Sequence, residues 1–68
     1  MQVYYDDKSD LLYIRLDERT QEVVNRRVAE DIVLDIGNED KIVGIEILDA
    51  SQRLNLDSLL PIRYEARR

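Results

Sequence analysis

The sequence has no cysteine and no histidine, and these two absences remove whole classes of site. Without cysteine there is no disulfide and no thiolate ligand for zinc. Without histidine, most transition-metal sites and every serine–histidine triad are excluded. Ser9, Ser51 and Ser58 therefore have no histidine base to activate them. We expect no cofactor, no metal and no catalytic residue, and we predict that the chain is not an enzyme.

Glycine and long apolar runs are scarce as well. Gly37 and Gly44 are the only glycines, and two isolated glycines cannot form a glycine-rich phosphate loop. The apolar stretches are a few residues long, whereas a membrane helix needs about 20. The N-terminal segment MQVYYDD lacks the basic and apolar regions of a signal peptide. We therefore expect a cytoplasmic protein that does not enter a membrane.

The chain is also short, with 68 residues, which predicts one β-rich domain over residues 1–68. A domain of this size buries only about 60% of the surface that its unfolded chain exposes. Small folds usually gain stability from a disulfide, a metal or a second subunit. Because the sequence lacks the residues for the first two, we predict a homo-oligomer or a complex with a small protein partner.

The net charge of −5 is unevenly distributed along the chain. Residues 1–51 carry a net charge of −7 and residues 52–68 a net charge of +2. The acidic part repels a phosphate backbone, which argues against nucleic acid as a partner. An alternative function remains open, in which the basic tail associates with nucleic acid through Arg63, Arg67 and Arg68.

Apolar residues alternate with polar ones along most of the chain, and this period of two predicts strands. Residues 2–6 and 11–16 are two such segments, separated by a polar turn. Residues 22–28 fit a strand, and a short helix is the alternative. The arginines of that segment indicate the edge of a sheet or a solvent-facing side.

The clearest element is a β-hairpin over residues 32–48. Its turn, residues 37–40, predicts a four-residue loop built on a type I turn. An odd register is required for the two apolar sets to share one face of the hairpin. Those sets are Ile32, Leu34 and Ile36 on one strand and Val43, Ile45 and Ile47 on the other. Gly44 interrupts the return strand and predicts a bulge or the close approach of another backbone.

The C-terminal segment after residue 48 is rich in apolar residues without a clear period. Asn55 or Asp57 can cap a short helix that ends before Pro61, and residues 61–68 are expected to be extended or flexible. We expect part of this tail to cover the open face of the sheet and the rest to bind a partner. The predicted partner-binding residues are Leu54, Leu56, Leu59, Leu60, Ile62 and Tyr64.

Together these segments predict an α+β fold: mainly an antiparallel meander of four or five strands, with a short C-terminal helical segment. Two groups of carboxylates are candidate sites within it. Asp6, Asp7 and Asp10 resemble a fragment of a calcium loop, but turn-forming hydrogen bonds are the interpretation we prefer. Asp35 and Glu46 fall on the same face of the hairpin, where they could perform acid–base chemistry, bind a metal or pair with Arg15.

Two segments of the sequence resemble a small prokaryotic family catalogued as domain of unknown function 2283. They are YDDKSDLLYIRL, which begins at Tyr5, and DIVLDIGNEDKIVGIEILDAS, which ends at Ser51. The resemblance covers about residues 4–53 and leaves out residues 54–68. Members commonly have a glycine in the hairpin turn where this chain has Asp40, and aspartate tolerates the left-handed backbone conformation.

The resemblance implies a compact β-sheet domain with a short C-terminal helical segment. It implies no established activity, cofactor or catalytic residue. Members of the family lie beside small toxin-like proteins, which would make this chain an antitoxin-like partner of a small basic protein. The function that we expect is therefore a non-enzymatic protein-interaction module that acts as a homodimer or binds such a partner. A carboxylate-based metal-binding protein is a further alternative.

Overall fold

The computed structural model describes residues 1–59 and 65–66, and it contains one sheet and two short α-helices. The five main strands are Gln2–Asp6 (β1), Leu11–Arg15 (β2), Val24–Ala29 (β3), Ile32–Ile36 (β4) and Ile42–Ile47 (β5). The helices Ala50–Arg53 (α1) and Leu56–Leu59 (α2) follow, and then the two-residue strand Glu65–Ala66 (β6). The α+β class, the C-terminal helical segment and a strand over most of residues 22–28 are confirmed.

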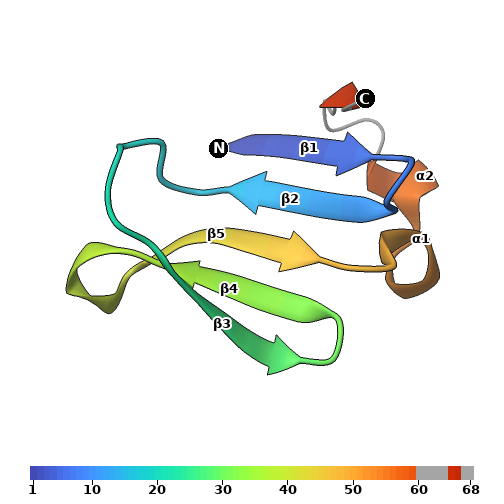
Figure 1. The fold of residues 1–68 in the computed structure, drawn as a ribbon. Helices are drawn as coiled ribbons and strands as arrows, with labels where there is room; N and C mark the ends of the chain where they lie inside the picture. The colour runs from blue at the N-terminus through green and yellow to red at the C-terminus, as the bar shows by residue number, and fades with distance from the viewer. Residues whose placement is uncertain (60–64, 67–68) are drawn as a thin grey trace.

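The strands are arranged in the order β3-β4-β5-β2-β1-β6 (Figure 1). The five main strands are antiparallel to their neighbours, and β6 is parallel to β1. The predicted meander order is wrong, because β2 and β3 are consecutive in the chain but β4 and β5 lie between them. The central position belongs to the apolar strand β5, while β3 with its arginines lies at the edge, where its side chains reach water.

The β4–β5 hairpin has the predicted odd register. Ile32 lies opposite Ile47 and Leu34 lies opposite Ile45, so their side chains share one face. The loop runs from Gly37 to Lys41, and it contains a turn of 3₁₀ helix over Asn38–Asp40. It is thus longer than the predicted four-residue loop, and a bulge near Ile36 restores the odd register.

The residue types of Asp40 and Gly44 in this hairpin suit the backbone conformation of the first and the narrow space beside the second. Asp40 has a φ of 60°, so aspartate does adopt the left-handed conformation at this turn. A Cβ built on Gly44 would lie 2.8 Å from Cζ of Tyr13, which is closer than real atoms approach. The Tyr13 ring therefore lies directly over Gly44, and the predicted bulge is present as well, because the pairing with β4 shifts between Gly44 and Ile42.

The strand pairing gives the sheet two faces of different chemistry. On one face, two rows of side chains cross the four strands β1, β2, β5 and β4 without a charged residue. We call it the apolar face, and its residues are Val3, Tyr5, Leu12, Ile14, Ile32, Leu34, Ile45 and Ile47. The opposite face we call the polar face, and its residues are Tyr4, Tyr13, Arg15, Val33, Asp35 and Glu46.

Neither α-helix forms a second layer on the sheet. Both α1 and α2 lie beyond the ends of the strands (Figure 1), and neither has extensive contacts with any strand. Within the described part of the chain, the buried apolar residues are Leu12, Val43 and Ala50, and no large side chain is completely buried. The hydrophobic core is therefore small, as the length predicts.

Helix α2 begins after Asn55, as predicted, and the side-chain oxygen of Asn55 accepts a hydrogen bond from the Ser58 amide at 3.4 Å. Among residues 1–59 and 65–66, no helix is both long enough and apolar enough to span a membrane.

Candidate functional site

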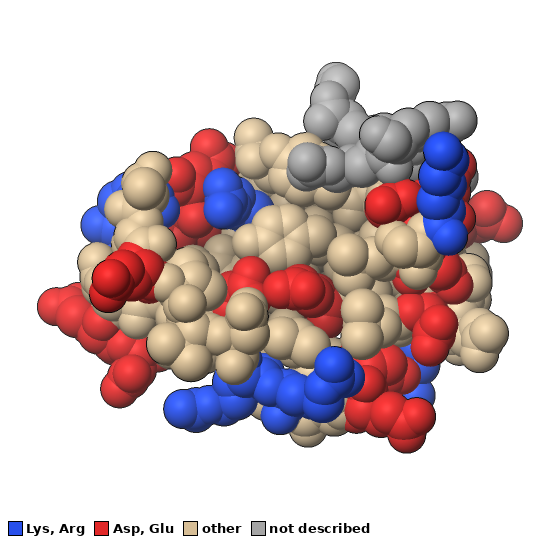
Figure 2. All heavy atoms as spheres, in the orientation of Figure 1, with Lys and Arg blue, Asp and Glu red and all other residues tan. Residues whose placement is uncertain are grey.

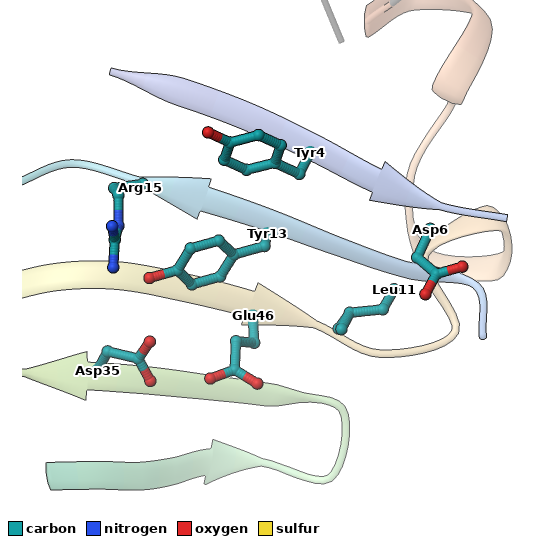
Figure 3. A pocket seen from close by; sticks show the side chains of 7 residues that line it. All are labelled: Tyr4, Asp6, Leu11, Tyr13, Arg15, Asp35 and Glu46. Atoms are coloured by element: carbon teal, nitrogen blue, oxygen red, sulfur yellow. The ribbon is translucent and has the colours of Figure 1, made fainter. Parts of the chain in front are cut away.

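The polar face contains an open depression with a volume of about 380 Å³. Its lining residues come from β1, β2, β4 and β5 (Figure 3) and are Tyr4, Asp6, Leu11, Tyr13, Arg15, Asp35 and Glu46. Seen on the molecular surface in Figure 2, acidic residues lie in the middle of this face, with uncharged residues around them. Alternation along the strands brings these residues together, because each of them points to the same side of the sheet.

A tyrosine and an arginine form one wall of the depression. The Tyr13 ring lies over Gly44, which is buried and has no side chain to displace it. The Arg15 guanidinium carbon is 6.0 Å from the centre of the same ring. The hydrogen bond with Tyr13 raises the pKa of Arg15. Arg15 therefore remains a cation at any physiological pH, and it contacts an aromatic ring rather than forming the carboxylate–arginine pair that the sequence suggested.

Two carboxyl groups form the other wall. Asp35 is 7% exposed, and its Oδ1 accepts a hydrogen bond from Asn25 Nδ2 at 2.6 Å. Glu46 lies beside Asp35 on the neighbouring strand (Figure 3). Burial, and then the hydrogen bond and the charge of Asp35, raise the pKa of Glu46 above its usual range. Placing these two residues on one face was a correct prediction from the hairpin register.

Such a pair holds a proton, or accepts a cationic group, more readily than an isolated carboxylate does. Acid–base catalysis would also need a substrate and a reacting group, and the chain has no histidine or cysteine to act as partner or nucleophile. In the part of the chain that the structure describes, no group of three or more potential ligands is placed to hold a metal ion. The depression thus presents two neighbouring carboxyl groups opposite a tyrosine and an arginine.

The aspartate turn between β1 and β2 has a structural role, as preferred from the sequence. Asp6 Oδ1 accepts a hydrogen bond from the Lys8 amide at 3.0 Å. The Asp10 carboxylate accepts hydrogen bonds from the Tyr5 hydroxyl at 2.7 Å and from the Ser51 amide and hydroxyl at 3.0 and 2.7 Å. Bonds from Ser51, and then from Tyr5, lower the pKa of Asp10. Asp10 therefore joins the turn to the start of α1, a role that sequence spacing did not indicate.

A second depression of about 500 Å³ lies where the β3–β4 turn meets α1. Arg53 Nε is 2.8 Å from Asp31 Oδ2 in its wall. The ion pair connects α1 with the hairpin, and we interpret it as a structural contact.

The predicted partner-binding residues are only partly described. Leu54 and Leu56 are half-buried, and Leu59 ends α2. Leu60, Ile62 and Tyr64 lie outside the described residues, as do Arg63, Arg67 and Arg68. The prediction that the tail covers the open face of the sheet is not confirmed for its described helices, which lie beyond the strand ends (Figure 1).

The apolar face is therefore the surface that sequence reasoning missed. Alternation identified most of its residues, but it gave no sign that the described helices would lie beyond the strand ends rather than on this face. Exposed apolar side chains extend the face at one end of the sheet, where Leu16 is 44% and Val24 is 66% exposed.

These features define a class of small α+β protein: one twisted sheet with an apolar face, a polar face and short helices at its end. Residues 2–51 match the model of the family described as "Protein of unknown function (DUF2283)", and the chain belongs to this family. The family match confirms the resemblance that the sequence motifs indicated.

One curated relative is a protein of Methanosarcina mazei named "Putative hypoxanthine phosphoribosyltransferase". The two sequences are 56% identical over 41 residues. The matched segment is 56% of this chain and 33% of that protein, so the chain spans about a third of its length. The activity in its name is therefore that of a longer protein. No solved structure matches this chain.

Proposed function

We propose that this chain is a non-enzymatic protein-interaction module of the cytoplasm, which acts as a homodimer or as the partner of a small basic protein. The observation that supports the proposal is the apolar face, on which neither described helix forms a layer. A sheet with one apolar face is stable in water when a second layer buries that face. Neither described helix supplies this layer, and among the residues whose burial the structure describes only three apolar side chains are buried. Another polypeptide supplies it in our proposal.

The charge of the chain favours a basic molecule as the second kind of partner. The net charge is −5, and two carboxyl groups lie at the base of the depression on the polar face. Complementary charge accelerates association and selects against acidic partners. An antitoxin-like role requires this kind of surface, and binding to a basic partner should weaken as salt is added.

The leucine-rich tail is the second surface in this proposal. Leu54 and Leu56 follow α1 and are half-buried, so substituting both with serine should weaken partner binding more than it weakens folding. Thermal unfolding of the double variant measures folding, and partner capture measures binding. Equal binding by the variant and the wild type would remove the tail from the proposal.

Photo-cross-linking in the native cell tests the proposed function directly. A photoreactive residue replaces Leu34 on the apolar face, and the matched control replaces Val33, its neighbour on the polar face. We expect a covalent protein adduct from position 34, because the face is buried against another polypeptide. Absence of a protein adduct from both positions, with the chain folded and expressed, would contradict the proposed function.

A further inference from the structure

The depression on the polar face has the size and the walls of a small-ligand site. Its volume of about 380 Å³ falls at the lower end of the range for ligand pockets, roughly 300–1,000 Å³. Tyr4 and Tyr13 contribute aromatic rings to the wall, and Leu11 contributes an aliphatic side chain (Figure 3). A partly apolar wall with a few polar groups is typical of pockets that orient a ligand.

Asp35 and Glu46 are the polar groups of one wall, and no positive charge of the described chain compensates them. Asp35 is 7% exposed, and its bonded neighbours, the Asn25 amide and Glu46, are not cations. Among residues 1–59 and 65–66, every ion pair involves other carboxyl groups. Carboxyl groups are rarely buried to this extent without a cationic partner. A cation brought to this wall would therefore gain two carboxylate contacts without breaking an existing ion pair.

Arg15, the cation that lines the depression, does not supply this charge. Its guanidinium bonds to Tyr13, and its carbon lies 6.0 Å from the centre of that ring. The Tyr13 ring in turn lies over Gly44, which is opposite Asp35 in the pairing of β4 with β5. Arg15 is therefore engaged on the opposite wall, and the charge that complements the carboxyl pair has to come from a ligand.

The walls favour a guanidinium group over other cations. A metal ion needs more oxygen ligands, and no group of three or more potential ligands is placed to hold one in the part of the chain that the structure describes. A guanidinium has several N–H donors in one plane, so it bonds two carboxyl groups at once, and its flat face packs on aromatic rings. It is also more weakly hydrated than an ammonium group and enters a partly apolar depression at a lower cost.

We propose that the depression on the polar face binds an alkylguanidinium group, which donates hydrogen bonds to Asp35 and Glu46 and packs beside Tyr13. The proposal goes beyond the proposed function, because it requires neither the apolar face nor a second polypeptide. A free small cation and an arginine side chain of another protein both carry this chemistry, and the experiment below separates the two sources.

Amide NMR spectra of the isotope-labelled full chain, titrated with ethylguanidinium at about pH 8 and low salt, test the proposal. We expect saturable shifts at the amides around the depression, those of Asp35 and Glu46 among them. Ethylammonium, the matched probe without the planar donors, should bind roughly fivefold more weakly. The absence of a saturable shift with ethylguanidinium, or equal binding of ethylammonium, would overturn the proposal.

Two matched variants locate the binding group. Glu46→Gln removes a carboxylate and keeps the shape of the side chain, so it should weaken ethylguanidinium binding roughly tenfold or more, as the loss of a charge-assisted hydrogen bond does. Glu39→Gln makes the same change of charge on an exposed side chain of the hairpin loop, and it should leave the affinity within about twofold. Equal weakening by both variants would also overturn the proposal, because binding would then follow the net charge alone.

A blocked peptide with a single arginine between alanines separates the two sources. Binding of the peptide as tightly as ethylguanidinium supports an arginine side chain as the ligand. Binding of ethylguanidinium alone supports a free small cation. Failure of this proposal is distinct from failure of the proposed function, because the in-cell adduct from position 34 reports on the apolar face and not on the depression.

Discussion

The two faces of the sheet share the same strands and differ in almost everything else. The apolar face has two uniform rows of side chains, most of them aliphatic, and neither described helix forms a layer on it. On the polar face, each residue has a particular contact: Tyr13 lies over Gly44, Asn25 bonds to Asp35, and Glu46 lies beside Asp35. The apolar face stabilises the fold through the apolar area that it buries, whereas the polar face stabilises it through individual contacts. Substitutions at adjacent positions should therefore have different, and even opposite, effects on the free energy of unfolding.

The largest effect is expected from Ile45→Gln on the apolar face. The substitution removes an aliphatic side chain and places an amide in an apolar row, at a cost of about 2–4 kcal/mol in the free energy of unfolding. Self-association should be lost as well. Urea unfolding and sedimentation of the same samples provide the two measurements. Unchanged stability and mass would show that this face remains open to water.

Gly44→Ala should have the next largest effect, through the polar face. The new methyl group meets the Tyr13 ring, and the strain should cost about 1–3 kcal/mol. The matched double variant adds Tyr13→Leu, which removes the ring. In the double variant, the cost of the alanine should largely disappear, as denaturant unfolding of the four proteins of this cycle will show. Additive effects would contradict the contact between Gly44 and Tyr13.

Glu46→Gln should act in the opposite direction from Ile45→Gln, although the two positions are adjacent. Burial raises the pKa of Glu46, so the folded chain keeps its proton at a pH where the unfolded chain has lost it. This group therefore makes the wild type less stable as the pH rises above about 4, the range in which an unfolded glutamate ionises.

Glutamine does not ionise, so the stability of Glu46→Gln relative to the wild type should increase from about pH 4 towards neutrality and then level off. Asp10 has a lowered pKa and loses its stabilising effect on acidification, but it is present in both proteins and cancels in the difference. Thermal unfolding across this range is the measurement. A pH-independent difference would show that Glu46 ionises normally.

The smallest effect is expected outside both faces, from Arg53→Ala. The pair of Arg53 with Asp31 connects α1 to the hairpin, but the arginine is 53% exposed and water screens the contact. Its loss should cost less than about 1 kcal/mol and should cost still less at high salt. A larger loss in denaturant unfolding would mean that α1 helps to hold the sheet together.

The hairpin and the candidate carboxyl pair were predictable because both follow from local alternation. Leu34 and Ile45 had to share a face, and Asp35 and Glu46 then fell on the opposite one. The Asp10 bonds to Ser51 were not predictable, because the two residues are far apart in sequence and no local pattern relates them. The same holds for the Tyr13 ring over Gly44, where the sequence predicted a bulge or the close approach of another backbone but not a side chain from β2.

The sequence by itself determined the strands, the parity of the hairpin register and the family, since these depend on alternation and on short motifs. Only the tertiary structure decided that β5 lies between β4 and β2 and that the described helices lie beyond the strand ends. The physical reason is that strand order and helix placement depend on contacts between distant segments, and many arrangements bury similar apolar area. Alternation defines the two faces, and the folded chain decides where the described helices lie relative to them.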